Sequence, residues 1–184
     1  YILIVDHATS TLDGAPRISK GAPLNWLDNW LKQHAPKIPR QYVDLDQGGE
    51  LDNNTQVRAL FQRHSYDVLP TGANSSHQNG PVERAHQTIG NALCATLHGA
   101  NLDVKFWPYA FHAYLGIKNA LPGKDNAPSA FEHCYASKPD FCALRTFGCR
   151  VWVCPSGKRC GKLSNHVHKG IFLGYLPNTM KNIQ

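Results

Sequence analysis

The stretch SSHQNGPVERAHQTIG, Ser75–Gly90, leads from a small polar run into the start of a helix. Pro81 suits the first helical turn, where its missing N–H leaves no hydrogen bond unmade. After it, apolar and small residues recur at helical spacing and predict one buried face: Val82, Ala85, Ile89, Ala92, Leu93 and Thr96. We therefore expect a helix that begins at Pro81, preceded by a loop over residues 71–80.

Glu83 falls at the border of this face, in line with Gln87 and Gly90. A carboxylate at such a border can enter a cleft and bind a metal ion without being sealed in the core. The alternative is a first-turn Glu that complements the helix dipole, a common arrangement that contributes some tenths of a kcal/mol. Taken alone, the position of Glu83 favours this alternative.

Asp46 is a second candidate carboxylate, at the end of the short strand predicted over residues 41–46. Gly48 and Gly49 then let the chain turn sharply, which leaves Asp46 at the carboxyl edge of its strand. Asp44 alternates with Asp46 and shares its face, but the glycine pair selects Asp46. Two carboxylates close together raise each other's pKa unless a cation lies between them, so Asp46 and Glu83 indicate Mg²⁺ or a shared proton.

The rest of the chain alternates strands with helices. Strands are predicted over residues 1–6 and 66–70, with a doubtful one over 11–19 that Gly14 and Pro16 weaken. Helices are predicted over 23–34, over 53–64 with Asn53 or Asn54 as the cap, and over 106–121. The inner faces are expected to comprise Leu24, Leu27, Trp30 and Leu31 in the first helix, and Phe106, Tyr109 or Ala110, Ala113 and Ile117 in the last. This order predicts an α/β layered fold.

Composition places the chain among globular proteins. It has 184 residues, 42% of them hydrophobic and 10% aromatic. No apolar run approaches the roughly 20 residues needed to cross a bilayer, and the opening residues do not form a signal peptide, so we expect a soluble intracellular protein with no membrane partner. Because a strand begins at Tyr1 and no initiating Met precedes it, we also expect a fragment of a longer chain.

Six cysteines could indicate disulfides or a zinc site: Cys94, Cys134, Cys142, Cys149, Cys154 and Cys160. They contain no C-x-x-C pair and have no His-x-x-x-His companion, which disfavours zinc. The pattern fits scattered, buried thiols in a reducing compartment better.

Positive charge is concentrated in the second half of the chain. Residues 1–100 hold eight Lys and Arg against nine Asp and Glu, whereas residues 101–184 hold eleven against four. No acidic residue follows Asp140, and aromatic residues alternate with the basic ones there. This asymmetry indicates a polyanionic partner; the alternative is a solvated surface whose acidic counterpart lies elsewhere.

Five blocks, in this order, resemble the integrase region of Ty1/copia-type LTR retrotransposons: DLDQGGELDNN, SSHQNGPVERAHQTI, FWPYAFHAYLGIKNALPGK, LRTFGCRVWV and KGIFLGYLPN. The resemblance covers nearly the whole chain. It implies an RNase H-like three-layer α/β core without its first strand over residues 1–105. A helical extension over 106–145 and a basic, truncated SH3-like β region over 146–184 would follow.

The resemblance also implies a metal triad of two Asp and one Glu. Its second Asp matches Asp46, in D-Q-G-G-E where the family has D-N-G-G-E, and its Glu matches Glu83 in Q-N-G-x-x-E-R. The first Asp would lie upstream of Tyr1, because YILIVDHATS matches the strand after the one that carries it. Asp6 is then a strand-end residue that begins an Asx-type turn over His7–Ser10.

By resemblance, the function is metal-dependent cleavage and strand transfer that inserts element DNA into target DNA. Two Mg²⁺ or Mn²⁺ ions would serve as cofactors. Residues 72–80 would form a mobile flap, with Gln78 and Asn79 near the element end and Gln87 facing DNA. Arg84 would contact phosphate or pair with a carboxylate, and Lys158, Arg159 and Lys162 would hold backbone phosphates.

The family further implies homo-oligomers and a nuclear location, with a stage in cytoplasmic virus-like particles. We expect this fragment by itself to be inactive. The alternative function is an inactive relic that acts only as a nucleic-acid-binding module. Another RNase H-like nuclease is disfavoured by the last two blocks.

Overall fold

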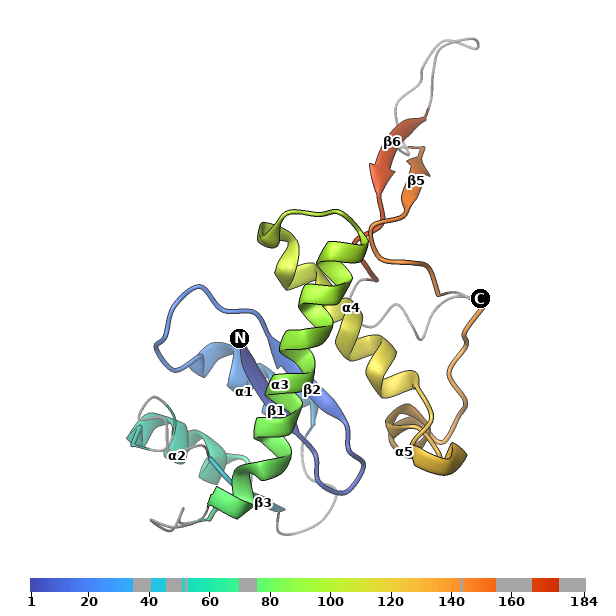
Figure 1. Ribbon diagram of the computed structural model, residues 1–184. Helices are drawn as coiled ribbons and strands as arrows, with labels where there is room; N and C mark the ends of the chain where they lie inside the picture. Colours follow the sequence, from blue (N-terminus) through green and yellow to red (C-terminus); the bar gives the residue numbers. More distant parts are fainter. Residues whose placement is uncertain are drawn as a thin grey trace. The chain divides into compact units, whose positions relative to one another are not determined.

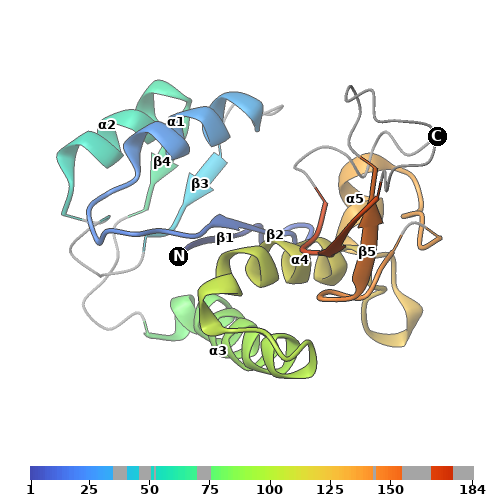
Figure 2. The same cartoon turned by 90° about the horizontal axis from the view of Figure 1, so that it is seen from above.

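The computed structural model describes residues 1–34, 41–45, 51, 53–69, 76–142, 144–154 and 167–175, with only the backbone described for 76–79. The chain divides into two compact units. One comprises Tyr1–Pro16 with Val82–Gln184, and the other Arg17–Pro81. Figures 1 and 2 show the elements of each unit in two views. The domain boundaries expected after residues 105 and 145 stay predictions.

The first unit contains the N-terminal β-hairpin. β1 (Ile2–Val5) pairs antiparallel with β2 (Leu12–Ala15), and Leu3 lies opposite Gly14. Both strands agree with expectation, including the doubtful one. Gly14 is required there because a Cβ would lie 2.3 Å from the carbonyl oxygen of Ile2 and 3.1 Å from the Phe111 ring.

The long helix α3 (Ser76–Gly99) begins five residues earlier than predicted. Pro81 lies inside it and not at its first turn. The ring fits because its φ is already helical and because Gly80, having no Cβ, avoids the usual clash of the preceding residue with proline. The segment Ser76–Gly80 is therefore helical and not part of a flap loop, while residues 72–75 lie outside the described residues.

The predicted buried face of α3 is confirmed. Ile89 and Leu93 are buried, Val82 and Ala85 are half-buried, and Leu97 continues the face by one further turn.

The helix η1 (Val104–Phe106) leads into α4 (Trp107–Ala120), whose buried face differs from the predicted one. Tyr109 is exposed, and Ile117 is half-buried. The buried side chains of α4 are Ala110, Phe111, Leu115 and Ala120. Because α4 is apolar around most of its circumference, spacing alone did not determine which face turns inward.

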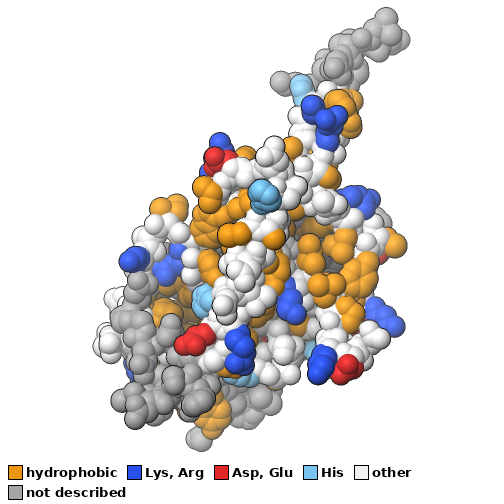
Figure 3. Space-filling model, in the orientation of Figure 1, with side chains coloured by type: hydrophobic (Ala, Val, Ile, Leu, Met, Phe, Trp, Pro, Cys, Tyr) orange, Lys and Arg blue, Asp and Glu red, His pale blue; other side chains and the backbone are white. Residues whose placement is uncertain are grey.

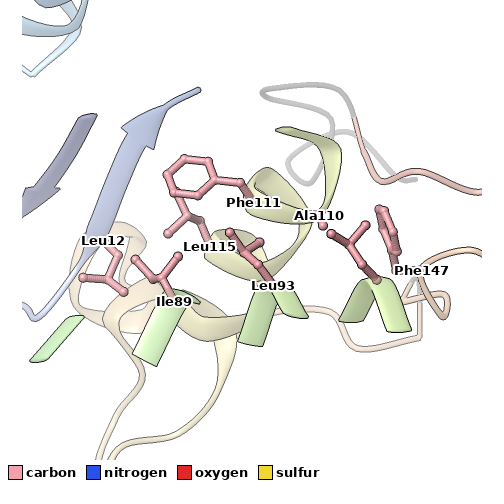
Figure 4. Close-up of a cluster of buried hydrophobic side chains, with 8 residues drawn as sticks. Leu12, Ile89, Leu93, Ala110, Phe111, Leu115 and Phe147 are labelled. Atoms are coloured by element: carbon pink, nitrogen blue, oxygen red, sulfur yellow. The ribbon is translucent and has the colours of Figure 1, made fainter. Parts of the chain in front are cut away.

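One hydrophobic cluster joins these elements (Figure 4). Ile89 and Leu93 from α3 face Phe111 and Leu115 from α4, and Leu12 of β2 lies at one end of the group. The full cluster is Leu12, Ile89, Leu93, Leu97, Ala110, Phe111, Leu115 and Phe147. It fixes α3 and the N-terminal hairpin against α4.

The remaining elements of this unit follow α4. They are η2 (Lys124–Asn126), α5 (Ala130–Tyr135), β5 (Arg150–Val153) and β6 (His168–Ile171). Ser129 and Glu132 form a capping box at the start of α5. β5 and β6 pair antiparallel with Trp152 opposite Lys169, which agrees with a β region there; its SH3-like character stays a prediction.

The second unit is an α/β arrangement. Parallel strands β3 (Gln41–Val43) and β4 (Tyr66–Val68) are connected through α2 (Thr55–Arg63), as a parallel pair requires. Helix α1 (Leu24–Gln33) lies with α2 on the same side of the pair (Figure 2). Asn54 caps α2 by accepting from the N–H groups of Gln56 and Val57, as predicted.

The cysteines differ from expectation. Cys94, Cys134, Cys142 and Cys154 are exposed thiols and Cys149 is half-buried, whereas burial was predicted. They lie on outward faces of helices and in connecting segments, where their size gives no reason for burial. Within the described residues, no helix has both the length and the apolar character needed to cross a membrane.

Candidate functional site

The predicted site residues divide into those that the structure describes and those that it does not. Asp46, Lys158, Arg159 and Lys162 lie outside the described residues. Gln78 and Asn79 lie in the first turns of α3, but their side chains are likewise outside the described part. The side chains that can be placed are Glu83, Arg84 and Gln87, all on α3.

Glu83 is exposed on α3 beside the half-buried Val82 and Ala85. This is the border position that its spacing predicts. Within the part of the chain that the structure describes, no hydrogen bond or ion pair engages the Glu83 carboxylate. A carboxylate presented in this way can take a hard cation such as Mg²⁺.

Arg84 and Gln87 are exposed on the same helix. The backbone carbonyl of Arg84 accepts a hydrogen bond of 2.8 Å from the Thr88 hydroxyl, which helps to hold this turn of α3. Gln87 lies one turn beyond Glu83, so the two side chains point to one side of the helix.

His86 is a residue that the sequence did not indicate. Its Nδ1 lies 3.0 Å from the Tyr1 hydroxyl oxygen, and the two ring centroids are 5.2 Å apart. Tyr1 also packs against Phe111, at 4.6 Å between ring centroids, and burial raises the pKa of the Tyr1 hydroxyl above its ordinary value. No local pattern marks a contact between residues so far apart in sequence.

Asp6 is engaged in its own turn. One carboxylate oxygen accepts from the Ala8 N–H at 3.1 Å and the other from the Thr9 hydroxyl, while the Asp6 N–H donates to the Thr11 carbonyl. The predicted Asx-type turn is thus confirmed, and both oxygens of Asp6 have local donors.

The strand before Asp46 ends in the described part of the chain. Tyr42 and Asp44 are exposed and Leu45 is buried, as alternation along a strand requires. The face shared by Asp44 is therefore an outward one. No group of three or more metal-ligating side chains occurs among the described residues, a set that omits Asp46.

The hairpin of β5 and β6 presents a basic and aromatic face. Arg150 and Trp152 alternate on β5 and lie opposite Ile171 and Lys169 on β6, so all four side chains project from one side. All four are exposed. Cations next to an aromatic ring are suited to holding nucleic-acid phosphates and bases.

The arrangement of side chains on the surface is visible in Figure 3. Along α3 the surface is mainly uncharged, with hydrophobic side chains gathered on either side of the helix. Lys and Arg side chains are more frequent than Asp and Glu on the face shown.

Comparisons with known proteins agree with the family expected from the sequence. No protein-family model matches the chain. The retrovirus-related Pol polyproteins from transposons RE1 and RE2 of Arabidopsis thaliana are 29% and 27% identical to it over 133 residues. Each alignment covers 71% of this chain and 9% of the relative, so the chain corresponds to a small part of either polyprotein.

A solved structure supports the fold. The catalytic core domain of BIV integrase superposes with a TM-score of 0.53 and 14% sequence identity, covering 71% of this chain and 82% of that chain. The chain is thus similar in sequence to retrovirus-related Pol polyproteins of plant transposons and has the RNase H-like fold of a retroviral integrase catalytic core.

Proposed function

We propose that the chain is part of a retrotransposon integrase that cleaves and joins DNA in a metal-dependent reaction. The observation that carries the proposal is an integrase-core fold whose long helix presents Glu83 as an exposed carboxylate. Similarity to Pol polyproteins of two transposons supports the same function.

Asp46 and Glu83 would be the metal ligands that this chain supplies, and a first Asp upstream of Tyr1 would complete the set. Bound Mg²⁺ or Mn²⁺ would supply Lewis-acid stabilisation of the attacking and leaving oxygens of a phosphodiester. Arg84 and Gln87 lie on the helix of Glu83 and would position DNA by contacts to its backbone. Element-end DNA and target DNA are the proposed partners, with a homo-oligomer as the working assembly.

The test is strand transfer by the chain extended upstream through the strand that carries the first Asp. Wild type should join DNA ends only when Mg²⁺ or Mn²⁺ is present. Glu83→Gln and Asp46→Asn should abolish joining and leave the circular dichroism spectrum unchanged, and Asp6→Asn should retain most activity because Asp6 serves its turn. Full activity in Glu83→Gln, or loss confined to Asp6→Asn, would refute the assignment.

A nucleic-acid-binding module without catalysis is the second candidate, and the exposed face of Arg150, Trp152 and Lys169 favours it. Replacing Arg150 and Lys169 by Ala should lower the slope of log K against log salt by about 0.9 for each DNA phosphate that the protein no longer neutralises. The triple change Lys158→Ala, Arg159→Ala and Lys162→Ala should act alike. Lys124→Ala, an exposed cation in η2, is the control. Binding with this salt dependence, but without joining activity in the extended chain, would select the module.

A further inference from the structure

The contact between His86 and Tyr1 places a second functional group beside Glu83. His86 follows Glu83 by three positions on α3, so the two side chains are neighbours on the helix surface. Its Nδ1 lies 3.0 Å from the Tyr1 hydroxyl, and the rings are tilted by 31°. One ring nitrogen thus has an intramolecular partner, and the other, Nε2, is directed away from Tyr1.

Tyr1 is well placed to orient this imidazole. Its ring lies 4.6 Å from Phe111 and 6.3 Å from Trp107, measured between centroids, so it is held by buried or half-buried aromatic residues of α4. Because Tyr1 keeps its proton near neutral pH, its hydroxyl can donate to Nδ1. The proton of the neutral imidazole then resides on Nε2, which becomes a hydrogen-bond donor.

The surroundings of His86 suit an anion. Glu83 is the single acidic residue of α3, and exposed Arg84, Gln87 and Thr88 supply donor groups around it. At Gly90, one turn beyond His86, an added Cβ would meet no atom within 4 Å. This side of the helix is therefore open to a ligand.

We propose that His86, oriented by Tyr1, donates its Nε2–H to a phosphate oxygen of the DNA bound next to Glu83. This inference rests on the proposed function, because it takes DNA as the ligand of the Glu83 face. It makes His86 a DNA-binding residue and Tyr1 the residue that positions it. The proton-bearing Nε2 would fix the strand's register beside the carboxylate without taking part in bond cleavage.

The experiment measures binding of a fluorescein-labelled duplex of about 20 base pairs, by anisotropy at low salt and pH near 8, where the imidazole is neutral. His86→Ala should weaken binding about tenfold, the scale of one hydrogen bond to a charged group. Tyr1→Phe, which keeps the ring and removes the hydroxyl, should weaken it about threefold. His98→Ala removes an exposed histidine at the far end of the same helix and should bind as wild type.

Two further variants separate a DNA contact from a purely structural role. The amide of Asn stands where Nδ1 stands and can satisfy Tyr1, whereas the amide of Gln reaches the position of Nε2. His86→Gln should therefore restore most of the affinity, and His86→Asn should not. Equal affinity in wild type and His86→Ala, recovery in His86→Asn alone, or no binding of the duplex by wild type would overturn the inference.

Failure of this inference is distinguishable from failure of the proposed function. If His86→Ala binds as wild type while Glu83→Gln abolishes strand transfer, only the inference fails. If the variants behave as expected and the extended chain joins no DNA ends, the catalytic function fails and the DNA contact of His86 remains.

Discussion

The side-chain amide of Asn119 hydrogen-bonds to both backbone groups of Leu12. Its Nδ2 donates to the Leu12 carbonyl at 2.7 Å and its Oδ1 accepts from the Leu12 N–H at 2.9 Å. Both groups point away from β1, so one residue of α4 covers the outer edge of β2 at this position. The neighbouring outward N–H, that of Gly14, donates to the carboxylate of Asp13 at 2.7 Å.

Asn119→Leu should destabilise the protein by about 2–4 kcal/mol, because it leaves the N–H and the carbonyl of the buried Leu12 without partners. Chemical denaturation gives the difference in free energy of unfolding. Asn91→Leu is the matched control, because Asn91 is exposed on α3. Similar small losses in both variants would mean that the Asn119 amide contributes little.

Gly14→Ala should destabilise the hairpin by about 2 kcal/mol or more, since its Cβ would overlap the carbonyl oxygen of Ile2 and press on Phe111. Gly21→Ala meets no atom within 4 Å and should leave the thermal midpoint nearly unchanged. The paired thermal scans decide the point, and an unaffected Gly14→Ala would show that β1 and β2 separate easily.

Leu115→Ala should cost about 2–5 kcal/mol, because Leu115 is 5% exposed within the hydrophobic cluster. Ile117→Ala, which the sequence pattern would have ranked as a core change, should cost about 1 kcal/mol, because that side chain is half-buried. Urea denaturation of the two variants compares the faces directly. The reverse ranking would restore the face predicted from spacing.

Gly90→Ala should stabilise α3 by about 0.5–1 kcal/mol. Gly90 lies in the middle of the helix, and an added methyl group would meet no atom within 4 Å. A higher midpoint of thermal unfolding is the expected result. A lower one would show that the helix surface at Gly90 is covered in solution.

Asp28 should make the α1–α2 contact sensitive to acid. Its hydrogen bonds to Lys32 and then to His64 hold the pKa of its carboxyl below the ordinary value. A depressed folded-state pKa contributes stability above the unfolded pKa of about 3.9, and that stability disappears as the pH falls through the folded value. The gap in urea midpoint between wild type and Asp28→Asn should therefore close between about pH 5 and pH 2. A constant gap over that range would contradict the prediction.

Much of the local structure could be predicted from the sequence, because it depends on short-range patterns. The faces of α1 and α3 follow from apolar spacing, and the Asn54 cap follows from one side chain that accepts from two nearby N–H groups. Pro81 was misjudged, because the rule for proline does not include the relief that the preceding glycine gives. The face of α4 was misjudged, because a helix that is apolar all round is oriented by its neighbours.

The site was predicted unevenly for the same reason. The exposure of Glu83 follows from its place on α3, which local spacing determines. The pairing of His86 with Tyr1 and that of Asn119 with Leu12 join residues 85 and 107 positions apart. Such contacts exist only once β1, α3 and α4 have packed, so no short pattern announces them.

The division into two units has a consequence for the order of folding. All of the second unit lies within Arg17–Pro81, so its parallel strands and both helices can form from contacts between nearby residues. The first unit needs both ends of the chain, since β2 is completed only when Asn119 is available. During synthesis from the N-terminus, the second unit can therefore fold while Tyr1–Pro16 still awaits α3 and α4.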